Sequence, residues 1–466
     1  MNPSNHAIQS PNSRHNLILP AVALLVCAAM TVVFWPGVAT WEVIQFEFQR
    51  NLPVMNDWKS PFVAYIYWIA DYFFESTGPV LLTQQLLFWA GLALLTVSAI
   101  SNPIQRVFFF LVVAALPLVW ISEILLWKEA WTMSLLMLSM GGVFAYLKTG
   151  KPSYALIGVL GGILLTLTRQ NALLLAMPTC YVGAQLITAK LSTNTPKKQR
   201  LVRVTAFFVL VAVALSVNWA VNKAGKERCH IYHHAILWDL AAISLYEGKI
   251  LIPEEFRHKG AAGSLKRIRA YFNYYNSDPL FYSEKSPLKL YGTAYSPCDQ
   301  GLPMGLLLKT WTGAIGHYPG TYLRHRLMYI VHLLGITNIS GDRGGLKYYP
   351  IDSEFSSNTN RSPRFDHIRH HPIYKAMASG RILPGWTYVV VFLLSGFGLS
   401  KQKYAHADYL RFIWLGGLAY LGTFLLIGSG AVLRYISVFA VLGPALLVGR
   451  RLVPRHPQAD KIESDQ

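Results

Sequence analysis

Charged residues are scarce in this chain of 466 residues, and their scarcity narrows the class of protein. Only 14% of the residues are Asp, Glu, Lys or Arg, whereas 53% are hydrophobic. Several apolar runs reach the roughly 20 residues that a helix needs to cross a bilayer. The composition therefore excludes a soluble protein and predicts an all-α, polytopic membrane protein.

Acidic residues are rarer than basic residues: the chain has 23 Asp and Glu and 42 Lys and Arg, which gives a formal net charge of +19. In a membrane protein such an excess is typical of loops that are retained in the cytoplasm, so it does not predict a nucleic-acid partner. From Ala130 to Lys226 there is no acid at all. An acid that does lie near membrane depth is therefore a candidate functional group, because charge is costly to place there.

About ten apolar runs are predicted to span the membrane. They lie at 17–36, 80–100, 106–122, 130–147, 153–169, 171–190, 204–221, 384–400, 409–427 and 431–449. The run at 62–76 is apolar and aromatic, but it is short and contains Asp71 and Glu75. If it crossed the membrane, the most basic loop would lie outside, so we interpret it as an interfacial or re-entrant helix. The first run lacks a clear small-residue cleavage site and is expected to remain as a span.

With ten spans, both termini and nearly every basic cluster lie in the cytoplasm. The chain then divides into an N-terminal transmembrane module (1–221), whose first outer loop is 37–79, and a mixed, mainly helical extracytoplasmic domain (222–383). The C-terminal transmembrane helices and a cytoplasmic tail complete it (384–466). We expect a multi-pass protein among the lipids of a bacterial inner membrane, with its site on the periplasmic face.

Cysteine is also rare, with four residues in the chain. Cys27 and Cys180 fall inside apolar runs and are expected to pack as small apolar residues. Cys229 and Cys298 lie in the long polar segment. If that segment is extracytoplasmic, a disulfide between them is permitted.

The predicted topology brings charged groups from separate segments to one face of the membrane. The acids lie after the first span or just before the fourth span. The bases lie next to these acids or at the ends of other spans. They are Glu42, Glu47, Asp57, Glu123 and Glu129, with Lys59, Lys128, Arg169 and Arg434. A single charge there can simply anchor a helix at the headgroups, but convergence from four segments indicates a functional site.

A carboxylate beside Lys and Arg at the outer surface suits a substrate with a lipid tail and a phosphate. Lys and Arg are good partners for phosphate oxygens. The carboxylate can act as a general base on a hydroxyl acceptor. The cations would stabilise the departing lipid phosphate. Together these groups fit transfer of a sugar from a polyprenyl-phosphate donor to a glycan, lipid or protein acceptor.

Four short motifs occur in order along the chain. They are "TWEVIQ" with Glu42, "WKSPFVAYIYW" with Lys59, "LLWKEAWTMSLLML" with Lys128 and Glu129, and "AVLRYISVFAVLGP" with Arg434 and Tyr435. In this order they resemble motifs of the C-type (GT-C) glycosyltransferases, such as the protein O-mannosyltransferases and the aminoarabinose transferases that modify lipid A. The resemblance covers roughly the first 190 residues and the last span.

The resemblance implies a GT-C-like fold, a catalytic acid just after the first span and a Lys that meets the lipid phosphate. Glu42 is the preferred base because it lies closest to the end of that span, with Asp57 as second choice and Glu47 as a third competitor. Glu129 corresponds to the further acid that opens the fourth span in relatives. The chain departs from the family in having Ser60 in place of a proline, and Glu where many relatives have Asp in the first loop.

The long outer segment offers further candidates. "HYPGTYLRHRLMYIVHLLGI" (317–336) is typical of an amphipathic helix, from which Arg324 and Arg326 could reach the donor phosphate or lipid headgroups. In a second predicted helix, 233–248, Asp239 is expected to be solvated or to cap the helix. Histidines recur in "CHIYHH" and "HIRHH", but only Asp366 lies near them. No cofactor is expected to be required, and a divalent metal stays open.

Two other functions remain as alternatives. A transporter or flippase for lipid-linked sugars commonly shows internal repeats, and this sequence shows none. An O-antigen ligase or polymerase-like enzyme would use Arg and His of a large outer loop, and the "LRHR" stretch is compatible with it.

Overall fold

The computed structural model describes most of the chain. The described residues are 13–38, 43, 56, 60–191, 195–224, 227, 229–274, 277–282, 285–291, 298, 301–336, 371–372, 375, 382–399, 407–428 and 433–451. Helices dominate these residues, and beyond isolated bridges they form no strand. The fold of the described chain is therefore all-α, as the sequence predicts.

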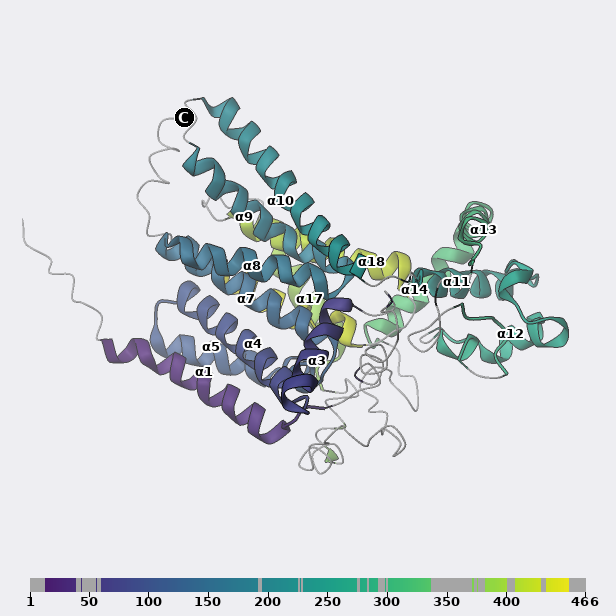
Figure 1. Cartoon of the computed structure of the whole chain (residues 1–466), viewed down its shortest axis with the longest axis horizontal. Helices are drawn as coiled ribbons and strands as arrows, with labels where there is room; N and C mark the ends of the chain where they lie inside the picture. The colour runs from purple at the N-terminus through teal and green to yellow at the C-terminus, as the bar shows by residue number, and fades with distance from the viewer. Residues whose placement is uncertain are drawn as a thin grey trace, which may run out of the picture.

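Most helices run alongside one another in one bundle, and a smaller helical lobe projects from one end of it (Figure 1). The bundle helices are α1 (Ser13–Phe34), α4 (Gly78–Ala99), α5 (Pro103–Ala115), α6 (Pro117–Ile124), α7 (Lys128–Thr149), α8 (Pro152–Thr168), α9 (Leu173–Lys190), α10 (Pro196–Ala224), α17 (Gly385–Gly396), α18 (Ala407–Ile427) and α19 (Phe439–Gly449). Each of the ten predicted apolar runs contributes to one or more of these helices.

Five helices in the described chain are long and apolar enough to cross a membrane, or six if the bent pair α5–α6 counts as one span. Four shorter apolar helices, around α1, α8, α17 and α19, accompany them. The protein is therefore a polytopic membrane protein, whereas a count of ten spans stays a prediction. Helix α7 is the most deeply buried of the five.

Helices α4 and α7 approach each other closely at Gly91 and Gly141. A side chain at Gly141 would collide with the backbone carbonyl of Gly91, and one at Gly91 would collide with the backbone of Leu138. Small residues at such crossings let the backbones of membrane helices pack tightly. This crossing fixes α7, whose first turn carries the candidate site.

The run predicted as one span at 106–122 is in fact two helices that meet at 67°. The break falls at Leu116, and Pro117, which has no backbone N–H, opens α6. The amides of Gln84 and Gln85 on α4 donate hydrogen bonds to the Glu123 carbonyl, at 2.7 and 2.5 Å. The two glutamines thereby hold the end of α6 against the bundle.

The ambiguous run at 62–76 forms a separate helix, α3 (Pro61–Phe74), at the end of the bundle near the lobe (Figure 1). Ser60 caps it by accepting a hydrogen bond from the Val63 N–H. Its outward face is aromatic and exposed, with Tyr65, Trp68, Tyr72, Phe73 and Phe74. Such a face suits a membrane–water interface, and the interfacial placement stays a prediction.

The lobe, which we define as the described part of residues 229–336, contains α11 (Tyr232–Glu247), α12 (Leu265–Tyr271), α13 (Met304–His317) and α14 (Pro319–Leu333). A disulfide joins Cys229 to Cys298, with their Cα atoms 4.4 Å apart. The Cys298 N–H donates to the Glu227 carboxylate, and Glu227 in turn forms a bridge with Asn56 of the first loop. The disulfide region and the first loop are therefore in contact.

Candidate functional site

The candidate site is centred on Glu129 in the first turn of α7. Its side chain is 2% exposed, and the helix N-terminus favours a negative charge at this position. The approach to α7 is set by a short parallel pairing: the Val38 N–H donates to the Ile124 carbonyl, and the Leu126 N–H donates to the Val38 carbonyl. Val38, just after α1, therefore fixes the position of the linker that leads to Glu129.

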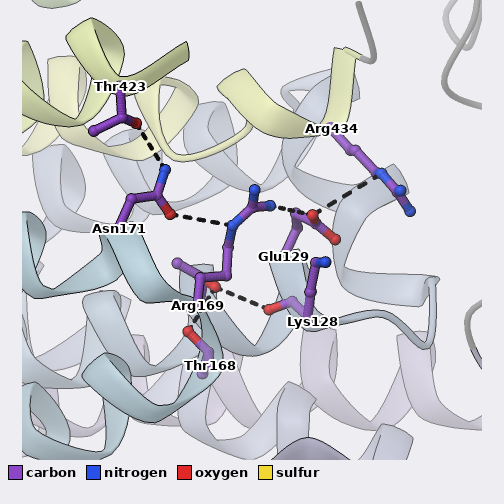
Figure 2. A network of polar contacts seen from close by, with 8 residues as sticks. Lys128, Glu129, Thr168, Arg169, Asn171, Thr423 and Arg434 are labelled. Atoms are coloured by element: carbon purple, nitrogen blue, oxygen red, sulfur yellow. Dashed lines mark hydrogen bonds and ion pairs between the residues drawn. The ribbon is translucent and has the colours of Figure 1, made fainter. Parts of the chain in front are cut away.

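Arg169 supplies the first cation. It follows the last residue of α8, and its guanidinium donates to the Glu129 carboxylate (Figure 2). The guanidinium carbon also lies 4.8 Å from the centre of the Tyr435 ring and 5.6 Å from that of Phe424. An ion pair and two cation–π contacts thus hold this arginine in one position.

Arg434 supplies the second cation from the opposite end of the chain. It lies in the turn Leu433–Ile436, and its Nε is 4.0 Å from Glu129 Oε1. The guanidinium packs over Trp127 and Tyr435, at 5.1 and 5.4 Å from the ring centres. Tyr435 therefore contacts both arginines, and Glu129 lies beside both.

A frame of hydrogen bonds supports these charges (Figure 2). The Arg169 Nε donates to Asn171 Oδ1 at 3.3 Å, and the Asn171 amide donates to the Thr423 hydroxyl at 2.9 Å. The hydroxyls of Thr132 and Thr168 lie 2.8 Å apart. These bonds join α7, α8, the start of α9 and α18, so four helices position one ion cluster. The sequence predicts that "TRQN" (168–171) reaches the face where the charges converge, but it does not predict Thr132 and Thr423 as hydrogen-bond partners.

The cluster carries more positive than negative charge. Glu129 is flanked by Arg169 and Arg434, and the half-buried Lys128 directly precedes it in the chain. The second oxygen of Glu129 is buried and accepts no hydrogen bond from the described residues. The arrangement can therefore hold an anion against its arginines. We define Lys128, Glu129, Arg169, Arg434 and Tyr435 as the charged cluster.

The first-loop candidates Glu42, Glu47, Asp57 and Lys59 lie outside the described residues. The described residues around them are anchored near the charged cluster. Before the loop, Val38 pairs with Leu125, on the linker that leads to Glu129. After the loop, the Ser60 hydroxyl donates to the Leu167 carbonyl at 2.6 Å, two residues before Arg169.

Arg326 is not among the residues that contact Glu129 in the described chain. Its guanidinium donates to Asp239 at 2.5 Å and to the Gly428 carbonyl at 2.6 Å. The Trp311 indole also donates to Asp239, at 2.9 Å, and His325 Nε2 lies 3.2 Å from the other carboxylate oxygen. The expectation that Asp239 is solvated or capping is wrong, because the side chain is fully buried among these partners.

The described residues contain no group of three or more His, Cys, Asp or Glu that could hold a metal ion. Of the second histidine cluster, His367 and His370 lie outside the described part, as does Asp366. In the first cluster, His233 Nδ1 pairs with the His230 carbonyl at 2.8 Å, and His234 Nδ1 lies 3.2 Å from the Ser277 hydroxyl. These two histidines serve as buried, hydrogen-bonded residues of the lobe.

Comparisons with known proteins give little beyond this geometry. No family model matches the chain, and no curated protein matches it. A solved structure of the archaeal oligosaccharyltransferase AglB from Archaeoglobus fulgidus, in complex with an inhibitory peptide and a dolichol-phosphate, is similar at a TM-score of 0.36 and 12% identity. The match covers 93% of this chain and 50% of that protein, so the chain spans about half its length. The function is therefore inferred from the residues of the site.

Proposed function

We propose that the protein is a glycosyltransferase that moves a sugar from a polyprenyl-phosphate donor to a hydroxyl acceptor at the outer face of a bacterial inner membrane. The observation that carries the proposal is the placement of Glu129 between Arg169 and Arg434 at one end of a membrane helix bundle. The first loop is anchored beside both of the helices that present Glu129 and Arg169.

The charge balance supports an anionic ligand. The charged cluster holds one carboxylate and three cationic side chains. A phosphate group carries the charge that such a set of cationic side chains binds. Arginine presents a planar set of donors that matches phosphate oxygens, and lysine adds a point charge. A phosphate carried on a lipid would reach such a site from the surrounding membrane.

In the proposed reaction the base takes the proton of an acceptor hydroxyl, and that oxygen bonds to the anomeric carbon of the donor sugar. The bond from this carbon to the phosphate oxygen breaks, and the oxygen leaves with the electron pair. Arg169, Arg434, Lys128 and Lys59 stabilise the departing lipid phosphate. The proposed base is Glu42, with Asp57 as second choice.

Glu129 has a different role in this scheme. It contacts Arg169 directly and lies beside Arg434, so it orients the two arginines toward the phosphate. Glu129 already serves as the counter-ion of Arg169. This pairing favours a first-loop acid as the base.

The ligase-like alternative depends on arginines of the outer segment. Arg326 is held by Asp239 and Gly428, and the Arg324 guanidinium packs 4.7 Å from the ring centre of Tyr246. Arg326 therefore links the lobe to the end of α18, and Arg324 packs within the lobe. These contacts weaken the argument from the "LRHR" stretch and leave the charged cluster as the better phosphate site.

Transfer of radiolabelled sugar from synthetic polyprenyl-phosphate monosaccharides tests the proposal in membranes that contain the full chain. Wild-type protein should label a membrane acceptor, and Glu42→Gln should abolish labelling while expression and insertion persist. If Asp57→Asn abolishes it instead, the base is Asp57. Movement of intact lipid-linked sugar across vesicles without transfer would support a flippase. Equal activity with a diphosphate-linked oligosaccharide would support the ligase alternative.

A further inference from the structure

A cavity of about 290 Å³ with a mixed polar and apolar lining lies where the last turns of α10 meet the start of α11. Its walls include Gln170, Asn218, Trp219, Asn222, His230 and Tyr232. Gln170 directly follows Arg169, so the cavity adjoins the charged cluster through consecutive residues whose Cα atoms are about 3.8 Å apart. The volume is close to the lower end of the ~300–1,000 Å³ found for small-molecule sites.

The amides on one wall are held in fixed orientations. Asn218 donates to the Thr166 carbonyl at 2.5 Å, and Asn222 donates to Asn218 Oδ1 at 2.6 Å. Within the described chain this bond uses one of the two amide N–H groups of Asn222. Its carbonyl oxygen and its other N–H can therefore bind a ligand that both donates and accepts. A sugar hydroxyl is such a group.

Aromatic rings form another part of the wall. Trp219 is 56% exposed and Tyr232 is 41% exposed. The Tyr232 hydroxyl lies 3.0 Å from His230 Nδ1, which fixes the ring's polar end. Flat aromatic faces offer apolar surface next to polar groups, and this combination matches the C–H face and hydroxyl rim of a sugar ring.

The charge of the cavity argues against a second phosphate site. Among the described residues of its lining, Lys223 is the single Lys or Arg, and its ammonium lies 4.6 Å from the centre of the Trp219 ring. By contrast, the charged cluster gathers three cations. Neutral amides and aromatic rings therefore predominate around the cavity, which suits an uncharged, polyhydroxylated ligand.

We infer that this cavity is a carbohydrate subsite that holds a sugar ring of the acceptor next to the charged cluster. This inference rests on the proposed function and narrows it, because the acceptor is then a glycan or glycolipid rather than a protein. Asn222 and Gln170 hydrogen-bond the hydroxyls, and Trp219 and Tyr232 contact the ring. The acceptor hydroxyl would point along the chain from Gln170 toward Arg169.

Direct binding tests the inference without any need for transfer. Saturation-transfer NMR would be recorded on the full chain in nanodiscs, with a panel of methyl hexosides, methyl 6-deoxyhexosides and methyl N-acetylhexosaminides. At least one member should bind, and Asn222→Ala and Trp219→Leu should each weaken it about fivefold or more, the loss expected for one good contact. Leu215→Ala, on the exposed surface of the same helix, is the matched control and should not change binding.

Three results would overturn the inference: no member of the panel binds, binding survives unchanged in both cavity variants, or inorganic phosphate displaces the sugar. A folded Asn222→Gln protein provides a second variant if Asn222→Ala does not accumulate. The proposed function can fail separately. Sugar binding that depends on Asn222, in a protein that transfers nothing from polyprenyl phosphate, would retain the subsite and reject the donor.

Discussion

Glu129 Oε1 and Arg434 Nε lie 4.0 Å apart, although one residue opens α7 and the other belongs to the turn before the last helix. Arg169 reaches the same carboxylate from the end of α8. The carboxylate is thus a shared counter-ion for two arginines from distant segments. Substitutions of these three residues can distinguish binding of the donor phosphate from orientation of the arginines.

Removing the shared charge should impair both activity and stability. Glu129→Gln leaves Arg169 and Arg434 without their carboxylate, and breaking a buried pair typically costs about 3–5 kcal/mol. We expect loss of sugar transfer and a lower unfolding temperature in detergent. Glu254→Gln, at a side chain 92% exposed, is the matched control. Unchanged transfer by Glu129→Gln would show that the cluster plays no part in the reaction.

Arg434→Lys should separate charge from geometry. Lysine keeps the positive charge but loses the planar fork that packs over Trp127 and Tyr435. We expect the KM for the polyprenyl-phosphate donor to rise about tenfold or more, because charge-assisted hydrogen bonds to phosphate are worth about 1.5–3 kcal/mol, while the KM for the acceptor stays unchanged. A rise confined to the acceptor KM would contradict a phosphate-binding role.

The buried Asp239–Arg326 pair should matter far more than an exposed pair. Asp239→Ala leaves the Arg326 guanidinium buried without its counter-ion, and the expected loss is about 3–5 kcal/mol of unfolding free energy. The comparison is Asp408→Ala, which removes the partner of Arg411 at a side chain 52% exposed; such a pair contributes about 0–1 kcal/mol. Denaturant titration followed by tryptophan fluorescence measures both. Equal losses would mean that the lobe pair is solvated.

Acidification should destabilise the lobe. Burial, with a smaller contribution from His233, lowers the pKa of His234 from its ordinary 6.5 to about 3. Below pH 6.5 the unfolded chain therefore binds a proton that the folded lobe does not. The stability that is present above pH 6.5 should fall as pH drops toward 3, by up to about 1.4 kcal/mol per pH unit. Burial lowers the pKa of His325 in the same direction.

Thermal unfolding between pH 7.5 and 5 measures this effect. His234→Asn should flatten the dependence, whereas the exposed His317→Asn should leave it unchanged. An identical slope in wild type and His234→Asn would assign the acid sensitivity to other groups.

The sequence predicted the position of Glu129 and Arg169 well, because long apolar runs locate the ends of helices and a charged residue at such an end stands out. Arg434 was visible for the same reason. The contact between Glu129 and Arg169 could not be read from the sequence, since it depends on how α7 and α8 cross. The role of Asn171 and Thr423 was also hidden, because neutral polar residues at helix ends carry no distinctive pattern.

Two features escaped prediction for different physical reasons. The average hydropathy of residues 106–122 gives no sign of the 67° bend between α5 and α6. Pro117 opens α6 at this bend, and Gln84 and Gln85 of α4 hold the end of α6. The burial of Asp239 depends on Arg326, which lies on another helix of the lobe. An acid followed by apolar residues looks solvated until its distant partner is known. The disulfide between Cys229 and Cys298 depends in the same way on spatial proximity, which spacing along the chain does not give.

The hydrogen bond from Arg326 to the Gly428 carbonyl also restricts how this protein could be recombined with others. A chimera that replaced residues 229–336 with a segment from another protein would remove the donor that braces the end of α18, six residues before Arg434. Such a graft would need its own cation at that position, so exchange of acceptor specificity by swapping whole modules should succeed only between parents that share this brace.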